Sequence, residues 1–375
     1  MGKHLVLVGA GHAHLTILSR LADYLERGHT VTLINPSPYT YYSGMGPGVL
    51  SGMYTPQEAR FNVKQMAEPG GAVFMEDSVW TIDARNRSLL LKSGRIVPYD
   101  VASFNCGSEV LLDPHWYCGS RVIPVKPVIN LYKSRLSILD EARGANLRIV
   151  VAGGGPAGVE VCANLWRLLY DNERTARITL VAGRRLLQGC PSGTRRLALN
   201  SLNRRGIHVM EGKRVQSVSE GCLGLSDKET LPFDYTFMAV GITPCAIFGR
   251  SGLQVARDGS LPVNGFLQSV DYPELFGGGD CICFEGRGLA RVGVHAVRQG
   301  PILHHNLSVA LGGGEMKDYA AEEDYMLILN MGDGKAILFK RGLTWGGRLP
   351  FLLKDFIDKR FVRKFRLSGE QDDGI

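Results

Sequence analysis

The sequence lacks any apolar run of about 18 residues, so no membrane-spanning helix is expected. A strand-like run begins already at residue 4, which leaves no room for a signal peptide. The eight cysteines show no paired spacing beyond Cys281 and Cys283, and the nine histidines show no metal-ligand spacing. These absences predict reduced thiols, no metal site and a cytoplasmic location.

Charge and hydrophobicity are ordinary, and glycine is the outlier. The chain is 45% hydrophobic and 21% charged with a net charge of +7, which excludes a disordered protein. Of its 375 residues, 47 are glycine, well above the roughly 7% of average proteins. No Gly-X-Y period accompanies them, so we expect many tight turns and close backbone approaches rather than a collagen helix.

One plan of strand, glycine turn, helix and strand occurs twice, with starting points 144 residues apart. The first copy covers residues 4–34, with a helix expected to end near Arg27, and the second covers residues 148–182. This order opens a dinucleotide-binding βαβ unit. Apolar runs alternate with helical patterns elsewhere too, which predicts an α/β fold with two Rossmann-like three-layer domains and a small C-terminal cap region.

The first glycine turn has the features of a pyrophosphate site. Gly9 permits the tight turn, Gly11 lets a pyrophosphate approach the backbone, and the following helix supplies amide donors. His14 replaces the third glycine, which predicts looser packing or a wider turn. Asn35 replaces the usual acidic residue and can still bind a ribose hydroxyl. An ordinary tight turn is the alternative explanation.

The second glycine turn matches the pattern fully, with Gly153, Gly155 and Gly158. Its second strand ends at Arg184 and Arg185, without the carboxylate that NAD-specific sites place there. Two arginines could accept a 2′-phosphate, which would allow NADPH as well as NADH. The alternative is that they are surface arginines on a loop.

Three further segments accompany the two turns. A short strand runs into the Gly-Asp pair at Asp280, and two other strands end on Gly107 and Gly241. The combination resembles the two-dinucleotide-binding flavoproteins of the pyridine nucleotide-disulfide oxidoreductase superfamily, over about residues 3–310. This resemblance implies that FAD binds the first turn, with Asp280 on its ribityl–pyrophosphate part, and that NAD(P)H binds the second.

Residues 41–54 lack the Cys-x4-Cys pair of the disulfide-reductase branch. The Ser-Gly-Met-x-Pro-Gly run from Ser43 and the Ala-x-x-Gln run ending at Gln299 resemble type II NADH:quinone dehydrogenases and relatives fused to selenide-water dikinase. The resemblance implies that the helix containing Gln299 begins beside the flavin ring and lines a quinone pocket. Sulfide:quinone oxidoreductases share this branch, but their cysteine near the second turn is missing.

Three residues are candidates for catalysis: Glu160, Gln299 and Lys126. Glu160 follows the second turn and could bind the nicotinamide carboxamide or relay a proton to reduced flavin; a helix N-terminal carboxylate stabilised by the dipole is the alternative. Lys126 lies at the crossing into the second domain and could contact flavin or only the linker. Cys106, Cys281 and Cys283 are better explained as small buried fillers.

Contacts with FAD or NAD(P)H are expected from a larger set of residues: Gly9, Gly11, Ala13, His14, Asn35, Ser43, Gly44, Val79, Cys106, Gly107, Asp280, Val294, His295, Gly153, Gly155, Pro156, Ala157, Gly158, Arg184 and Gly241.

Residues 348–366 carry seven basic and two acidic side chains. Apolar side chains share one helical face there, and charged ones fall opposite: Leu349, Leu352, Leu353, Phe356, Ile357 and Phe361 against Lys354, Asp355, Asp358 and Lys359. Such a helix suits an anionic bilayer surface. Docking of the apolar face on the flavin domain or on a second subunit is the alternative. Nucleic acid is disfavoured because no recognition fold accompanies the charge.

Together these features predict an FAD-dependent NAD(P)H dehydrogenase that passes electrons to a quinone or another acceptor. FAD is expected on residues 1–122 with 256–315, NAD(P)H on 123–255, and an interface region at 316–375. The alternatives are a sulfide:quinone oxidoreductase-like enzyme and a low-turnover flavin-binding regulatory or selenium-linked partner protein. A homodimer and a peripheral position on the inner face of the cytoplasmic membrane are compatible with the sequence.

Overall fold

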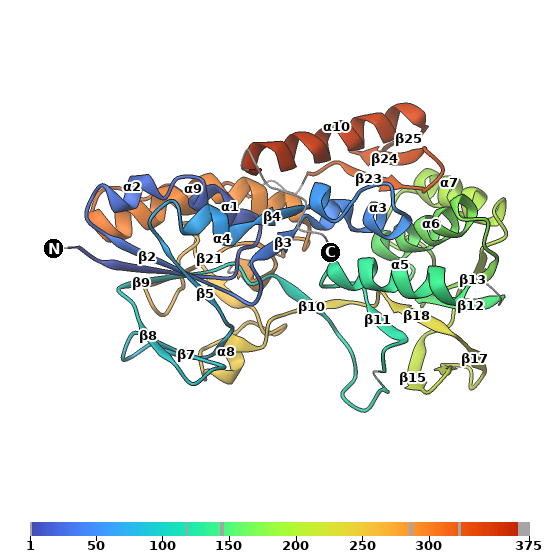
Figure 1. Ribbon diagram of the computed structural model, residues 1–375, viewed down its shortest axis with the longest axis horizontal. Helices are drawn as coiled ribbons and strands as arrows, with labels where there is room; N and C mark the ends of the chain where they lie inside the picture. Colours follow the sequence, from blue (N-terminus) through green and yellow to red (C-terminus); the bar gives the residue numbers. More distant parts are fainter. Residues whose placement is uncertain (1, 118, 143–145, 285–287, 322–323, 367–375) are drawn as a thin grey trace.

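A computed structural model describes residues 2–117, 119–142, 146–284, 288–321 and 324–366. Two five-stranded parallel sheets form its two halves (Figure 1). In the first sheet the strand order is β21 (Leu275–Gly277), β9 (Val101–Phe104), β1 (His4–Val8), β2 (Thr30–Asn35) and β5 (Val73–Glu76). The central strand β1 is an apolar run in which Leu5, Val6 and Leu7 are fully buried, as is typical where helices cover a parallel sheet. The helices α1 (His12–Leu18) and α9 (Gly293–Gly312) pack against each other there.

The second half repeats this plan. Its strand order is β11 (Val122–Pro124), β18 (Tyr235–Met238), β12 (Leu147–Ala152), β13 (Ala176–Val181) and β14 (His208–Met210). The helices of this half are α5 (Ile129–Glu141), α6 (Pro156–Asp171) and α7 (Ser192–Asn203). The α6 helix buries one apolar side against this sheet, with Leu165 and Leu168 fully buried.

Each half also carries a small antiparallel sheet. The first contains β6 (Val79–Asp83), β7 (Ser88–Leu91) and β8 (Ile96–Pro98), and the second contains β15 (Val215–Ser219), β16 (Cys222–Leu225) and β17 (Thr230–Pro232). The chain crosses between the halves twice, and these crossings pair as β10 (Ser108–Val110) and β19 (Ile242–Pro244).

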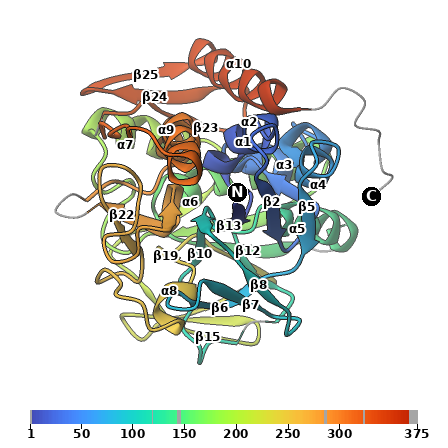
Figure 2. The same ribbon diagram turned by 90° about the vertical axis from the view of Figure 1, so that its left-hand side faces the viewer.

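A third layer lies over both halves. It consists of β23 (Leu327–Asn330), β24 (Ala336–Lys340), β25 (Leu343–Gly347) and α10 (Arg348–Phe365). Figure 2 shows α10, β24 and β25 together at the top of the molecule. The β-strands of this cap contact α6 and α7 of the second half, whereas α10 contacts β4 (Arg60–Asn62) of the first. The cap therefore joins the two halves.

Short elements complete the described chain: α2 (Ala22–Leu25), α3 (Gly46–Ser51), α4 (Val63–Ala67), α8 (Ile247–Arg250), β3 (Tyr39–Tyr41), β4 (Arg60–Asn62), β20 (Leu261–Val263), β22 (Ile282–Phe284), and the 3-10 segments η1 (Ser43–Met45), η2 (Gln57–Ala59) and η3 (Gly279–Cys281). In the described part of the chain, no helix has both the length and the hydrophobicity of a membrane span.

The two-domain α/β fold predicted from the glycine turns is confirmed. The helical stretch predicted to about Arg27 is interrupted, because α1 ends at Leu18 and a separate helix, α2, covers Ala22–Leu25. Ser19 caps this end, and its hydroxyl donates to the Thr16 carbonyl at 2.9 Å. A serine that satisfies a helix carbonyl in this way competes with the helical backbone.

Candidate functional site

The first glycine turn connects β1 to α1. Gly9 has a φ of +79°, which favours glycine. Asn105, at the end of β9, braces the turn: its backbone oxygen accepts from Gly11 N at 3.1 Å, and its Oδ1 accepts from Ala13 N at 2.9 Å. A Cβ on Gly11 would lie 2.4 Å from that same Oδ1. Sequence reasoning missed Asn105, although it directly precedes the two strand-end residues Cys106 and Gly107.

His14 closes the turn instead of widening it. The imidazole is fully buried, with Nδ1 2.5 Å from Gly9 O and Nε2 2.9 Å from Ser103 Oγ. Burial lowers the pKa of His14 to about 4, so the ring is neutral. The looser packing expected from the missing third glycine was therefore wrong, because a hydrogen-bonded ring fills that place.

The Asn35 amide is already engaged within the protein. Its Oδ1 accepts from Ala10 N at 3.0 Å, and its Nδ2 donates to Ser37 O at 2.6 Å. Asn35 thus ties the end of β2 to the glycine turn. A contact between Asn35 and ribose stays a prediction.

The three glycines of the second turn have different roles. Gly153 has a φ of +126°, and a Cβ on Gly158 would lie 1.8 Å from Gly153 O, so both positions need glycine for the fold. Gly155 has an extended backbone, and no described atom lies within 4 Å of a Cβ built there. Among the described residues no side chain caps the α6 helix that follows. This turn therefore leaves an open space in front of uncapped helix amides, which suits a phosphate.

Asp280 lies in a cluster of polar side chains beside the first turn. Lys126 Nζ is 3.0 Å from Asp280 Oδ2, and Ser108 Oγ donates to the same oxygen at 2.7 Å. Burial raises the pKa of Asp280, but Lys126 and Ser108 outweigh it and hold that pKa below its usual value. The carboxylate is thus ionised, and Lys126 contacts Asp280.

A hollow that is open to solvent is lined by Asp280, His295 and Gln299. Neither ring nitrogen of the buried His295 has a hydrogen-bond partner among the described residues, and the same is true of His12 Nε2. Gln299 Oε1 accepts from Gly279 N at 2.6 Å, so this amide holds the Gly-Asp turn. Buried polar atoms without partners favour an additional polar ligand at this place.

The start of α9 meets the first glycine turn. A Cβ on Gly293 would lie 3.4 Å from His12 Nδ1 and 3.8 Å from Ser43 Oγ. No side chain of the described residues caps this helix. Val294 and His295 belong to its first turn, so the helix dipole adds positive potential beside the hollow.

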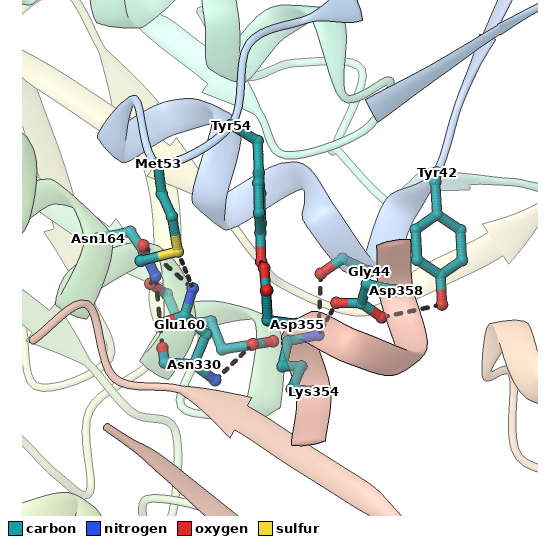
Figure 3. A network of polar contacts seen from close by, with 10 residues as sticks. All are labelled: Tyr42, Gly44, Met53, Tyr54, Glu160, Asn164, Asn330, Lys354, Asp355 and Asp358. Atoms are coloured by element: carbon teal, nitrogen blue, oxygen red, sulfur yellow. Dashed lines mark hydrogen bonds and ion pairs between the residues drawn. The ribbon is translucent and has the colours of Figure 1, made fainter. Parts of the chain in front are cut away.

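Glu160 occupies a separate polar cluster beneath the cap (Figure 3). Its Oε1 accepts from Asn330 N at 2.8 Å. Burial raises the pKa of Glu160 to about 7, although Lys354 lowers it. Lys354 Nζ donates to Gly44 O at 3.0 Å and contacts Asp358 Oδ2 at 2.9 Å. Sequence reasoning placed Lys354 on the polar side of the last helix but did not predict its contact with Gly44.

The α10 helix turns its charged side inward and its apolar side outward. Asp358 is 3% exposed, whereas Leu349, Leu352 and Phe356 are 61%, 58% and 59% exposed. The alternative prediction, in which the full apolar face docks on the flavin domain, was therefore wrong. Of the six apolar residues predicted for one face, Phe361 packs inward, with its ring 4.8 Å from that of Tyr42. Val362 and Phe365, outside that predicted set, are buried in the core.

Two cysteines expected to be free thiols are joined. Cys106 and Cys245 form a disulfide that links the two chain crossings, with Cα atoms 6.8 Å apart. Cys281 is free and buried, and burial raises the pKa of its thiol to about 12. Within the described ranges, no three His, Cys, Asp or Glu side chains are grouped to hold a metal ion.

The remaining predicted contact residues lie at or next to the ends of strands and helices. Val79 begins β6, Gly107 has a φ of +71° after β9, and Gly241 directly precedes β19. Pro156 and Ala157 open α6, and Arg184 is exposed after β13. Their contacts with FAD or NAD(P)H stay predictions.

The sequence matches the family described as pyridine nucleotide-disulphide oxidoreductase over residues 3–300. It is 25% identical over 292 residues to the demethylphylloquinone reductase NdbB of Synechocystis sp., covering 73% of this chain and 70% of that protein. It is 25% identical over 296 residues to the NAD(P)H nitrite reductase of Bacillus subtilis, covering 77% of this chain but only 35% of that longer protein. NDH2 from Plasmodium falciparum, solved in complex with NADH, has a TM-score of 0.80 at 13% identity, with 98% of this chain and 100% of that chain covered.

Proposed function

Because the chain belongs to the pyridine nucleotide-disulphide oxidoreductase family, we infer that it is an FAD-dependent NAD(P)H dehydrogenase with a quinone or related electron acceptor. The similarity to demethylphylloquinone reductase supports a quinone. The observation that carries the inference is the pair of glycine turns: one lies beside the ionised Asp280, and the other is open at Gly155 and near Glu160.

The residues around the first turn fit FAD. The Asp280 carboxylate would accept hydrogen bonds from ribityl hydroxyls, and Gly9 and Gly11 would receive the pyrophosphate. His12 and His295 offer ring nitrogens that lack partners among the described residues. When bound, FAD accepts a hydride from a nicotinamide and passes the electrons to a second substrate. The protein orients the cofactor and supplies positive potential from the start of α9.

The second turn and Glu160 serve the nicotinamide nucleotide. Open amides at the start of α6 would bind its pyrophosphate. Asn330 N fixes Glu160 Oε1, which leaves Oε2 to hold a proton. With a pKa of about 7, the carboxyl group can both take up and release that proton near neutral pH.

The spectrum of the purified, anaerobic protein tests this function. We expect a flavin spectrum that is bleached by NADH or NADPH, and steady-state NAD(P)H oxidation with a quinone or a dye. A yellow protein that neither nucleotide bleaches would contradict the dehydrogenase. Bleaching without turnover on any acceptor would favour the low-turnover flavin-binding partner.

The outward apolar face of α10 supports a peripheral position on an anionic membrane surface. A helix that buries its charged side and exposes leucines and a phenylalanine needs an apolar partner outside the protein. The segment 348–366 has a net charge of +5, from seven basic and two acidic residues. Arg360 and Arg363 are exposed and continue the face of Leu349, Leu352 and Phe356. Electrostatic attraction of the basic side chains to anionic lipids contributes about 1 kcal/mol per residue. This would add to the free energy gained by burying the apolar side chains in the membrane.

Replacement of Leu349, Leu352 and Phe356 by serine should lower the affinity for anionic phospholipid vesicles about 100-fold or more, because each apolar side chain contributes about 1.5–3 kcal/mol when buried. Vesicle co-sedimentation measures this. Turnover with a long-chain quinone should fall, and turnover with a water-soluble dye should persist.

Ile96→Ser is the matched control, because Ile96 is 68% exposed and lies in β8, far from α10 (Figure 1). Unchanged vesicle binding in the triple variant would disprove membrane docking. If that variant instead converted a dimer to a monomer in sedimentation, the face would bind a second copy of the chain.

No thiol is expected to take part in turnover. The Cys281 thiol is buried with a raised pKa, and Cys106 and Cys245 are joined to each other. Serine at Cys106, Cys245, Cys281 and Cys283 should leave at least half of the NAD(P)H–acceptor activity. Stopped-flow flavin reduction and steady-state turnover measure this in protein with full flavin content. Loss of turnover with flavin still bound would favour sulfide or polysulfide chemistry.

A further inference from the structure

The positive charge of the chain is concentrated in one segment of the second half. Residues 182–214 contain eight basic side chains and one acidic side chain, a net charge of +7, and the whole chain has the same net charge of +7. The rest of the chain therefore carries equal numbers of positive and negative side chains. The segment runs from the end of β13 through α7 and β14. Its field attracts anionic ligands to this part of the molecule.

Two arginines of this segment come from neighbouring strand ends. Arg184 follows β13, and Arg214 follows β14. A Cβ on Gly183 would lie 3.3 Å from Arg214 Cγ and 3.4 Å from Arg214 Nε, so the Arg214 side chain lies along the backbone that leads into Arg184. Gly212 N donates to Arg184 O at 3.2 Å and joins the two chain segments. Both arginines are exposed to solvent.

The loop that carries Arg184 packs against the second glycine turn. Leu187 N donates to Gly154 O at 2.7 Å, and a Cβ on Gly154 would lie 2.5 Å from Ala182 Cβ. In a dinucleotide-binding βαβ unit, the residues after the second strand reach the adenosine ribose. A carboxylate there binds the 2′-hydroxyl of NAD, whereas arginine accommodates the 2′-phosphate of NADP.

The one acidic residue of the segment is engaged within the protein. Glu211 Oε1 accepts from Leu186 N at 2.5 Å, and Arg195 holds the two carboxylate oxygens at 2.9 and 2.6 Å. Burial raises the pKa of Glu211, but these partners outweigh it and hold that pKa below its usual value. The carboxylate is thus ionised and already paired, which disfavours it as the acceptor for a ribose hydroxyl.

The next carboxylates along the chain are also paired. Lys213 contacts both Asp227 and Glu229, with Asp227 Oδ2 at 2.7 Å. In the described part of the chain, neither Arg184 nor Arg214 forms an ion pair with a carboxylate. Two guanidinium groups without an acidic partner, beside a nucleotide turn, indicate a phosphate ligand.

We propose that Arg184 and Arg214 form a site for the 2′-phosphate of NADPH, and that Arg214, which lies outside the glycine-turn motif, gives the protein a preference for NADPH over NADH. The proposal rests on the proposed function, because it names the nucleotide that the second turn receives. A guanidinium group donates two parallel hydrogen bonds to phosphate oxygens, so two arginines can engage the three free oxygens of a phosphate monoester.

The first experiment compares kcat/KM for NADPH and NADH in the holoenzyme. We expect the wild type to use NADPH at least about tenfold better, because hydrogen bonds to a charged group are worth about this much each. Arg184→Ala and Arg214→Ala should each lower kcat/KM for NADPH about tenfold or more and affect NADH much less, because NADH has no 2′-phosphate. Arg214→Lys keeps the charge but loses the planar fork, so its value should be intermediate.

Arg204→Ala is the matched control, because it removes the same charge from the same segment. Arg204 is exposed and precedes β14, so it lies at the opposite edge of the parallel sheet from the second turn. The ratio of NADPH to NADH use should stay at its wild-type value. A fall of this ratio to the level of Arg214→Ala would mean that the charge of the segment, rather than a contact of Arg214, selects the nucleotide, and would overturn the site.

A second readout does not require hydride transfer. Isothermal titration calorimetry with adenosine 2′,5′-bisphosphate and with 5′-AMP isolates the contribution of the 2′-phosphate. The wild-type holoenzyme should bind the bisphosphate at least about tenfold more tightly than 5′-AMP. The difference should disappear when Arg184→Ala and Arg214→Ala are combined.

The outcomes separate this site from the proposed function. Equal use of NADH and NADPH by the wild type, or an equal fall for both nucleotides in Arg214→Ala, would overturn the 2′-phosphate site and leave the dehydrogenase intact. A wild-type protein that oxidises neither nucleotide would overturn the proposed function. Calorimetry would then still decide the site: tighter binding of the bisphosphate through both arginines would support it, and equal binding of the two probes would overturn it.

Discussion

Asp280→Ala is expected to purify with little FAD. The Asp280 carboxylate is ionised, and Lys126 and Ser108 hold it in place beside the hollow at the first turn. Hydrogen bonds to a charged group contribute about 1.5–3 kcal/mol each. Loss of one or two such bonds corresponds to at least about tenfold weaker binding. The flavin-to-protein ratio, from absorbance after gel filtration, measures the loss.

Two further variants make this test specific to the Asp280 carboxylate. Asp258 lines the same hollow but pairs with Arg291 at its rim, where its side chain is 47% exposed, so Asp258→Ala should keep FAD. Asp280→Asn keeps the shape and removes the charge, so it should bind FAD with intermediate affinity. A fully yellow Asp280→Ala protein with wild-type affinity would remove Asp280 from the FAD site.

The glycine turns could be predicted from sequence because their requirements are local. Gly153 needs its φ of +126°, and Gly158 must not place a Cβ on the Gly153 carbonyl. Both constraints arise within six residues, so the sequence pattern records them directly. The same holds for the bounds of the second βαβ unit, predicted at residues 148–182, because β12 begins at Leu147 and β13 ends at Val181.

The contacts made by the cap could not be predicted in this way. Asn330 reaches Glu160 from a position 170 residues later, and Lys354 reaches Gly44 from a position 310 residues later; no spacing rule connects these residues. Helical periodicity separated the two faces of α10 correctly. It did not tell which face points inward, because that depends on whether water or an apolar partner covers the outer side.

The disulfide and the buried histidine illustrate the same limit. Cys106 and Cys245 are 139 residues apart, and only the pairing of β10 with β19 brings them together. His14 differs from the glycine that the pattern requires, but the cost of that difference depends on Ser103 and on the Gly9 carbonyl. A local motif shows that a position is unusual, whereas its partners are set by the tertiary fold.

Gly155→Val should abolish most use of NAD(P)H while FAD stays bound. The backbone of Gly155 has φ −79° and ψ −179°, which valine adopts without strain, and no described atom lies within 4 Å of the added Cβ. The fold should therefore tolerate the valine. Its methyl groups would fill the space where a pyrophosphate must approach the α6 amides. We expect kcat/KM for NAD(P)H to fall about 100-fold, since displacement of a substrate by about 1 Å has this effect.

Flavin content, Tm and stopped-flow flavin reduction by NAD(P)H decide between a lost nucleotide site and a damaged fold. Gly249→Val is the matched control, because its Cβ would also meet no described atom within 4 Å, and it lies in α8 away from the turn. Gly158→Ala should instead lower Tm, because its Cβ would lie 1.8 Å from Gly153 O. If Gly155→Val kept its flavin and reduced it at the wild-type rate, the nucleotide would not approach α6 through the space at Gly155. Glu160, two residues after Gly158 on that helix, would then lose its position beside the nicotinamide.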